Sequence, residues 1–89
     1  MNLPIIGISM GDPFGNGPEI TVKALAEKSL YERCRPLVVG DVASMEYAVK
    51  AVEKISGIHM QVRPVRSVAE AWFQYGVIDV YDLGLVKAS

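Results

Sequence analysis

The chain has 89 residues, of which 51% are hydrophobic and 21% are charged, and its formal net charge is −1. These values are typical of a folded domain and argue against disorder. Lysine and arginine are scattered singly, which argues against the clustered basic patch that nucleic-acid binding or membrane-surface binding needs. The longest apolar runs fall far short of the roughly 20 residues that span a bilayer.

The amino-terminal residues and the cysteine content together predict the cellular compartment of the protein. The opening residues Met1–Pro4 carry no basic region, so we expect no secretory signal. Cys34 is the single cysteine and can form no internal disulfide, which is typical of a reducing environment. The sequence therefore predicts a cytoplasmic protein.

The first predicted strand is the apolar stretch Leu3–Ser9, and a loop rich in glycine and proline follows over Met10–Gly17. Pro18 begins a helix, because proline is tolerated at the first helical position and Glu19 complements the helix dipole. We expect this helix to reach about Leu30. Its expected core contacts are Ile20, Ala24 and Leu25.

A second strand and a longer helix follow. The continuous apolar run Pro36–Gly40 predicts a strand that is covered on both faces. Asp41 is a suitable N-cap for the next helix, and Gly57 is expected to end it. Apolar residues recur along this helix at helical spacing, at Met45, Ala48, Val49, Val52 and Ile55.

The last predicted elements are shorter. Met60–Val65 predicts a third strand, which Pro64 places at a sheet edge or near a strand end. Ser67–Glu70 matches a capping box and predicts a short helical turn through Phe73. Val77–Leu83 is the fourth predicted strand.

Strands that alternate with helices across short links predict parallel strands joined by right-handed crossovers. We expect an α/β domain of three layers, with a partial parallel sheet between helices. Two or three helices on four strands would leave part of the sheet uncovered, and the chain stops after Gly84–Ser89 without a closing element. We therefore expect residues 1–89 to form a single incomplete α/β domain, the amino-terminal portion of a larger protein.

The segment that carries chemistry is Met10–Ile20, with the sequence MGDPFGNGPEI. It lies at the carboxyl end of the first strand, where open α/β sheets bind ligands, and its glycines let the backbone approach a ligand closely. A Walker A loop is excluded because Pro18 follows Gly17, and the dinucleotide fingerprint G-x-G-x-x-G fails because Ile20 holds the third glycine position. From spacing alone, a tight turn without a ligand is an equally good interpretation.

This stretch resembles the opening signature of the 4-hydroxythreonine-4-phosphate dehydrogenase family, which is close to MGDPAGIGPEI. The segments VKALAEK, VVGD and VIDVYD resemble that family too, so the resemblance runs over nearly all 89 residues but covers only the opening part of a family member. The stretch is also similar to GDGIGPE of isopropylmalate and isocitrate dehydrogenases, which implies their fold. Phe14 and Asn16 depart from the family's alanine and isoleucine, which suggests a divergent subgroup that acts on another phosphorylated hydroxy acid. If Asn16 is buried, it needs hydrogen-bond partners.

The resemblance implies an oxidoreductase. Family members use NAD to oxidise a secondary hydroxyl of a phosphorylated hydroxy acid, and the β-keto acid then loses carbon dioxide in a step of pyridoxal 5′-phosphate biosynthesis. A divalent metal, held by histidines from both subunits of a homodimer, polarises the hydroxyl. For this chain, the resemblance implies cofactor-binding residues in the glycine-rich turn, namely Gly11, Asp12, Gly15, Gly17 and Glu19. It places no catalytic residue and no metal ligand here, so we expect the 89-residue chain to be inactive alone.

Other conspicuous side chains have structural interpretations. His59 is the only histidine, and one imidazole cannot form a metal site, so we expect it in a surface loop. Asp79 and Asp82 are three residues apart on a strand, face opposite sides and therefore form no carboxylate pair. An aromatic cluster is expected in the core or in a subunit contact: Trp72, Phe73 and Tyr75.

Two other functions stay open. One is a stand-alone, non-catalytic α/β binding or interaction module, which the abrupt carboxyl end disfavours. The other is an enzyme of related fold, such as a phosphate acyltransferase, which the long signature disfavours. In each case we expect self-association, because an uncovered sheet face and sheet edges invite pairing.

Overall fold

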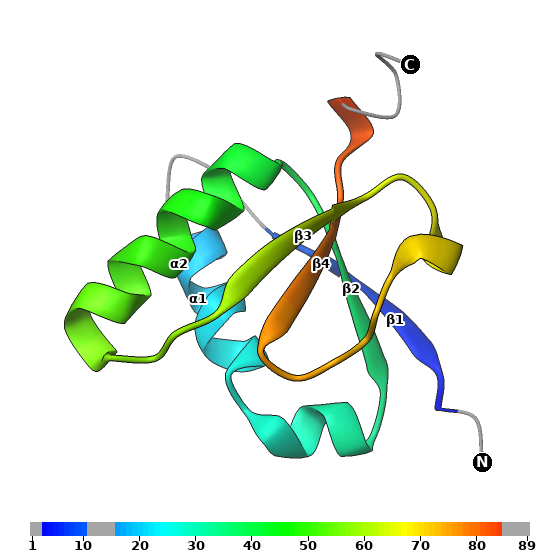
Figure 1. Cartoon of the computed structure of the whole chain (residues 1–89), viewed down its shortest axis with the longest axis horizontal. Coiled ribbons are helices and arrows are strands. Elements are labelled where there is room, and N and C mark those ends of the chain that lie inside the picture. The colour runs from blue at the N-terminus through cyan, green and yellow to red at the C-terminus, as the bar shows by residue number, and fades with distance from the viewer. Residues whose placement is uncertain (1–2, 11–15, 85–89) are drawn as a thin grey trace.

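The computed structural model describes residues 3–10 and 16–84 of the chain (Figure 1). All four predicted strands and both predicted helices are present, several with shorter bounds. In chain order, the elements are β1 (Ile5–Ser9), α1 (Gly17–Leu25), the 3₁₀ turn η1 (Lys28–Glu32), β2 (Arg35–Val39), α2 (Val42–Ser56), β3 (Gln61–Val65), the 3₁₀ turn η2 (Val68–Glu70) and β4 (Val77–Tyr81).

The four strands form one parallel sheet in the order β1-β2-β4-β3, which confirms the predicted parallel arrangement. β1 pairs with β2 along its whole length, from Ile5 opposite Arg35 to Ser9 opposite Val39. β3 is an edge strand, as its proline predicted. Pro64 has no backbone N–H to donate, and an edge tolerates that loss where a central ladder would not.

The strand order explains which face each connection covers. The steps from β1 to β2 and from β2 to β3 run in one direction across the sheet, so right-handed crossovers place α1 and α2 on the same face. The step from β3 back to β4 reverses that direction and must cross the opposite face. Figure 1 shows α1 and α2 together on one side of the sheet, with the segment that contains η2 on the other.

The expectation of helices on both faces is therefore wrong for residues 3–10 and 16–84. There the second face is covered by the 3₁₀ turn η2 and its flanking loop, because the link between β3 and β4 is too short to hold a packed α-helix. Part of that face stays open around β1, where Ile5 is 47% exposed and Val39 36% exposed.

The hydrophobic core lies between the sheet and the two helices. Val38, Ile78 and Val80 point into it from the central strands, and each is 0% exposed. Full burial of a side chain of this size stabilises the fold by about 1.5–3 kcal/mol. The helices contribute the other side of the core through Val22, Leu25, Met45, Ala48, Val49 and Val52.

Helix α1 ends at Leu25 and not near Leu30. The N–H of Ala26 is shared between two carbonyl groups, and Glu27 then takes an extended backbone conformation that breaks the helix before η1 begins. Leu25 is buried as predicted, but Ile20 is 63% exposed and Ala24 is exposed too. The helix buries a different stripe, formed by Pro18, Thr21, Val22 and Leu25.

Helix α2 confirms both of its predicted ends. The Asp41 carboxylate accepts a hydrogen bond from the backbone N–H of Ser44 at 3.0 Å, which caps the first turn. Gly57 takes a left-handed conformation with φ of 76° and ends the helix. Ile55 is 78% exposed, so its expected burial is wrong, because the face that packs on the sheet stops at Val52.

The capping box at Ser67–Glu70 does not form. The Ser67 side chain makes no capping hydrogen bond, and the Glu70 carboxylate instead accepts from the N–H of Arg66 at 3.3 Å. η2 stops at Glu70 and does not reach Phe73, because the backbone N–H groups of Trp72 and Phe73 donate to the Asp79 carboxylate instead.

None of the helices in the described residues is long and apolar enough to cross a bilayer.

Candidate functional site

The carboxyl ends of three neighbouring strands meet at one edge of the sheet. The N–H of Met10, just after β1, donates to the Val39 carbonyl at 3.3 Å, and the N–H of Gly40, just after β2, donates to the Tyr81 carbonyl at 3.1 Å. The chain then leaves this edge toward α1 and α2. This is the edge at which parallel α/β sheets place their ligands.

Two of the five predicted cofactor-binding residues lie in the described part of this edge. Gly17 is the first residue of α1 and Glu19 lies in its first turn, and both are partly exposed. The remaining three predicted residues, Gly11, Asp12 and Gly15, lie outside the described residues.

Asn16, one of the departures from the family signature, is exposed and needs no buried partner. Its carbonyl accepts the N–H of Ile20 at 3.0 Å, but its side chain does not cap the helix. The positive end of the α1 dipole is therefore not neutralised by Asn16, although the Glu19 carboxylate lies close by. The backbone N–H groups at such a helix start can donate hydrogen bonds to a polar group of a ligand.

Met10 and Gly40 fix the spacing between the ends of β1 and β2. Met10 is 6% exposed, and a Cβ built on Gly40 would lie 2.6 Å from its Sδ and 2.7 Å from its Cγ. The N–H of Asp41 also points at that sulfur, at 3.2 Å. A Cβ at position 40 would therefore force the buried Met10 side chain to shift. The sequence offered one signal for this, a glycine directly after an apolar strand.

Asp82 ties the end of β4 to the start of α2. Its carboxylate accepts the N–H of Val42 at 2.9 Å and the N–H of Gly84 at 2.8 Å. The sequence interpretation excluded Asp82 from a carboxylate pair but assigned it no role. An acid directly after a strand was the only signal of its role, because parallel strands end beside helix starts.

Asp79 holds the link between β3 and β4 on the other face of the sheet. It is 2% exposed and accepts the N–H of Trp72 at 3.1 Å and the N–H of Phe73 at 2.8 Å. Phe73 has φ of 54°, a left-handed conformation that is costly for a bulky residue. The buried carboxylate therefore stabilises a strained turn.

Trp72, Phe73 and Tyr75 do not form a buried cluster, because Phe73 is only partly buried and the other two are exposed. Trp72 is 53% exposed, and the guanidinium of Arg63 lies 4.2 Å from its ring centroid. Tyr75 is 44% exposed, donates its hydroxyl to the Ala26 carbonyl at 2.9 Å and packs edge-to-face on Tyr31, with ring centroids 5.9 Å apart. Burial raises the pKa of Tyr31 to about 12, and the negative charge of Asp79 adds to that shift.

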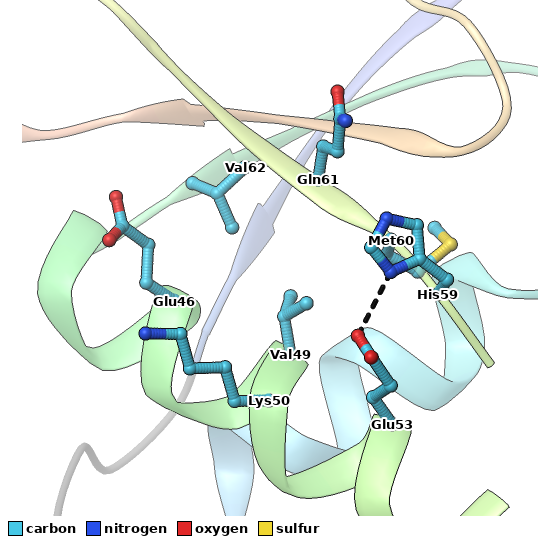
Figure 2. A pocket seen from close by; sticks show the side chains of 8 residues that line it. All are labelled: Glu46, Val49, Lys50, Glu53, His59, Met60, Gln61 and Val62. Atoms are coloured by element: carbon cyan, nitrogen blue, oxygen red, sulfur yellow. Dashed lines mark hydrogen bonds and ion pairs between the residues drawn. The ribbon is translucent and has the colours of Figure 1, made fainter. Parts of the chain in front are cut away.

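His59 is exposed, as predicted, in the link between α2 and β3. Its Nδ1 lies 2.9 Å from Glu53 Oε2, and the two residues border a groove of about 350 Å³ between α2 and β3 (Figure 2). The groove begins where β3 begins, so His59 lies at the amino end of that strand and not at the carboxyl edge. The groove is lined by Glu46, Val49, Lys50, Glu53, His59, Met60, Gln61 and Val62.

Within residues 3–10 and 16–84, no three His, Cys, Asp or Glu side chains are placed to hold a metal ion together. The described residues therefore do not fit the metal site that the family resemblance implies.

No family model matches the chain. It is 49% identical over 84 residues to a D-threonate 4-phosphate dehydrogenase from Cupriavidus necator, which covers 94% of the chain and 24% of that relative. It is 42% identical over 83 residues to a putative D-threonate 4-phosphate dehydrogenase from Symbiobacterium thermophilum, with 93% and 24% covered. The chain thus spans about a quarter of the length of these relatives.

Solved structures agree with the sequence relatives. A crystal structure of a 4-hydroxythreonine-4-phosphate dehydrogenase from Burkholderia phymatum matches with a TM-score of 0.82 and 46% identity, over 96% of the chain and 24% of that structure. The Klebsiella pneumoniae 4-hydroxythreonine-4-phosphate dehydrogenase matches with a TM-score of 0.71 and 32% identity, over 91% and 23%. In sequence and in fold, the chain matches the amino-terminal part of members of the 4-hydroxythreonine-4-phosphate dehydrogenase family.

Proposed function

We propose that this chain supplies part of the cofactor cleft of an NAD-dependent dehydrogenase that acts on a phosphorylated hydroxy acid. The observation that carries the proposal is the edge where β1, β2 and β4 end together. The described chain leaves β1 there at Met10, and the glycine-rich segment follows Met10 in the sequence, before α1. The names of the relatives supply the reaction class, a dehydrogenase with a phosphorylated substrate.

We propose D-threonate 4-phosphate as the first substrate to test, ahead of 4-hydroxythreonine 4-phosphate. The curated relatives at 39–49% identity carry the first name. The two compounds differ at carbon 2, which bears a hydroxyl group in the first and an amino group in the second. In both, oxidation of the carbon 3 hydroxyl passes a hydride to NAD, releases a proton and leaves a β-keto acid that can lose carbon dioxide.

The part that we propose for this chain is to hold the cofactor and not to perform the chemical step. The N–H groups at the start of α1 can donate to an oxygen of the cofactor, and the Glu19 carboxylate can accept from a ribose hydroxyl. A carboxylate at that point would repel a phosphate group, so we place the sugar there and not the pyrophosphate. We propose that Gly11, Asp12, Gly15 and Gly17 let the backbone come close to the same ligand.

The remaining machinery is proposed to lie in the rest of a larger protein. A divalent metal would supply Lewis-acid stabilisation of the substrate oxygen, but no described residue of this chain forms a site for it. We propose that the sheet is one part of an isocitrate/isopropylmalate dehydrogenase-like domain and that the 89-residue chain has no NAD-dependent turnover alone.

A chimera tests the proposal directly. The chain replaces the matched quarter of the Cupriavidus necator relative, to which it is 49% identical. Purified chimera is assayed for NADH formation with D-threonate 4-phosphate, with 4-hydroxythreonine 4-phosphate and with neither. We expect turnover with a phosphorylated substrate. A folded chimera that turns over neither compound would contradict the assignment.

The same chimera tests the role of Glu19. We expect Glu19→Gln to raise the KM for NAD about tenfold with little change in kcat, because a charge-assisted hydrogen bond to the bound sugar contributes about 1.5 kcal/mol. Glu27→Gln is the matched control, since Glu27 is an exposed acid just beyond the other end of α1. Equal effects of the two variants would remove Glu19 from the cofactor site.

A further inference from the structure

The two outer strands of the sheet, β1 and β3, differ in how their free edges are protected (Figure 1). β3 carries Arg63 and Pro64, and proteins use charged side chains and prolines to keep an exposed edge strand from pairing. β1 has the sequence IIGIS, with no charge and no proline. Within the described residues β1 is an edge strand, but its sequence is typical of a strand with a neighbour on each side.

The backbone on the outer side of β1 can accept a further strand. The Pro4 carbonyl accepts the N–H of Arg35 at 2.7 Å, so Pro4 faces β2. In a parallel strand the N–H and C=O of one residue point to the same side, and successive residues alternate between the two sides. The N–H and C=O groups of Ile5 and Gly7 therefore point away from β2, toward the free edge.

The outer side of β3 offers less. The N–H of Gln61 donates to the Gly76 carbonyl at 3.0 Å, so Gln61 faces β4. Val62 and Pro64 then face the free side, and Pro64 has no N–H. Within β3 only Val62 can donate to a further strand, so the sheet is better prepared to grow beside β1.

The face of the sheet that stays open lies beside the same strand. Ile5 is 47% exposed and Val39 36% exposed there, and a Cβ built on Gly7 would meet nothing within 4 Å. A connection from β4 to a strand outside β1 would run in the same direction as the step from β3 to β4, so a right-handed crossover would cover this face. A connection to a strand outside β3 would instead lie on the face that α1 and α2 already cover.

We propose that a β-strand from the rest of a longer protein pairs with the free edge of β1, and that the segment leading to it crosses the open face over Gly7. This rests on the proposed function, in which the chain is part of a larger dehydrogenase. The chain matches 24% of the Cupriavidus necator relative, so the rest of such a protein can supply the strand. Pairing would also bury Ile5 and Ile6, which are 47% and 46% exposed.

Amide hydrogen exchange, resolved to single residues, tests the edge. It compares the 89-residue chain with the chimera that carries this chain in place of the matched part of the Cupriavidus necator relative. We expect the amides of Ile5 and Gly7 to exchange about a hundredfold more slowly in the chimera, because the new strand accepts their N–H groups. The Val62 amide, on the free side of β3, is the matched control and should exchange equally fast in both proteins.

Three results would overturn the proposal. The first is an exchange rate of Ile5 and Gly7 that is the same in the chimera as in the chain. The second is a slowing at Val62 as large as that at Ile5 and Gly7, which would remove the choice of edge. The third is a slowing in the 89-residue chain that grows with its concentration, which would assign the edge to a second copy. A chimera with protected β1 amides but no turnover would support this proposal and contradict the proposed function.

Gly7→Leu tests the segment that crosses the face. The 89-residue chain has open space at this position, so its melting temperature should not fall. In the chimera the new side chain would meet the crossing segment, and we expect the melting temperature to fall by about 5 °C. Ala24→Leu, on the exposed side of α1, is the control and should lower neither melting temperature. A chimera that tolerates Gly7→Leu as well as the chain does would show that no segment crosses there.

Discussion

The carboxylate of Asp82 accepts the backbone N–H of Val42 at 2.9 Å, across 40 positions of sequence. Asp41 accepts the N–H of Ser44 at the same helix start. Two acids, one local and one remote, therefore satisfy N–H groups in the first turn of α2 and complement its dipole. This joint holds the end of β4 against the end of β2 and so shapes the carboxyl edge on which the proposed cofactor cleft depends.

Removal of the remote acid should loosen that joint. We expect Asp82→Ala to lower the free energy of unfolding by about 1–2 kcal/mol, because the Val42 N–H loses its acceptor. Asp82→Asn keeps an acceptor oxygen and should cost less. Urea unfolding, followed by circular dichroism, measures both. An Asp82→Ala variant with an unchanged urea midpoint would show that the joint does not stabilise the fold.

The contact between Met10 and Gly40 gives a paired test. Gly40→Ala places a Cβ 2.6 Å from a buried sulfur and should lower the free energy of unfolding by about 1–3 kcal/mol. Gly7→Ala is the control in the neighbouring strand, because a Cβ there meets nothing within 4 Å and its effect should stay within about 0.5 kcal/mol. The comparison uses the same urea titration, and equal effects at the two glycines would contradict the packing argument.

The sequence correctly predicted the features of the fold that depend only on a residue and its neighbours in the chain. Asp41 caps α2, Gly57 ends it in a left-handed conformation, and Pro64 lies on an edge strand, all as the sequence indicated. Each of these outcomes is set by the backbone needs of one residue and its nearest neighbours. Residues such as these could therefore be interpreted without knowledge of the tertiary structure.

The predictions of burial and capping that were wrong depend on tertiary contacts. Ile20 and Ile55 follow helical spacing, but which stripe of a helix is buried depends on where the sheet lies, and both residues are exposed. The capping box failed because Glu70 bonds to Arg66. Helical spacing does not show which stripe of a helix will face the sheet, and the capping-box pattern does not show which N–H group the acid will bind.

The sequence predicted a glycine-rich segment after the first strand but not the contacts beside it. β1 does end at Ser9, just before that segment, and the predicted cofactor role of the segment stays a prediction because residues 11–15 lie outside the described residues. The contacts that shape the edge join residues 30 to 40 positions apart, as between Gly40 and Met10 or Val42 and Asp82. A single sequence does not show which distant residues meet, so these contacts could not be predicted.

The buried carboxylate of Asp79 gives a third prediction. Asp79→Ala leaves the N–H groups of Trp72 and Phe73 without their acceptor and should lower the free energy of unfolding by about 2–3 kcal/mol. Phe73 should then leave its left-handed conformation, because that conformation is costly for a bulky residue and the Asp79 carboxylate no longer accepts its backbone N–H. Amide hydrogen exchange at Trp72 and Phe73 should be faster in the Asp79→Ala variant than in the unchanged protein, and the core amide of Val38 serves as the reference. Unchanged exchange at both amides would show that Asp79 does not hold the turn.

Tyr31 gives the final prediction, a dependence on alkaline pH. Burial and, after it, the negative charge of Asp79 raise the pKa of Tyr31 from 10.0 to about 12. The folded state therefore holds the phenolic proton more tightly than the unfolded state does. The resulting contribution to stability is fully present below pH 10 and is lost as the pH rises through about 12. Tyr31→Phe carries no such proton, so its unfolding free energy should fall less over this interval than that of the unchanged protein. The difference in tyrosinate absorbance between the two proteins during a pH titration isolates Tyr31, and a midpoint near 10 in that difference would show that the side chain is neither buried enough nor close enough to Asp79 to shift.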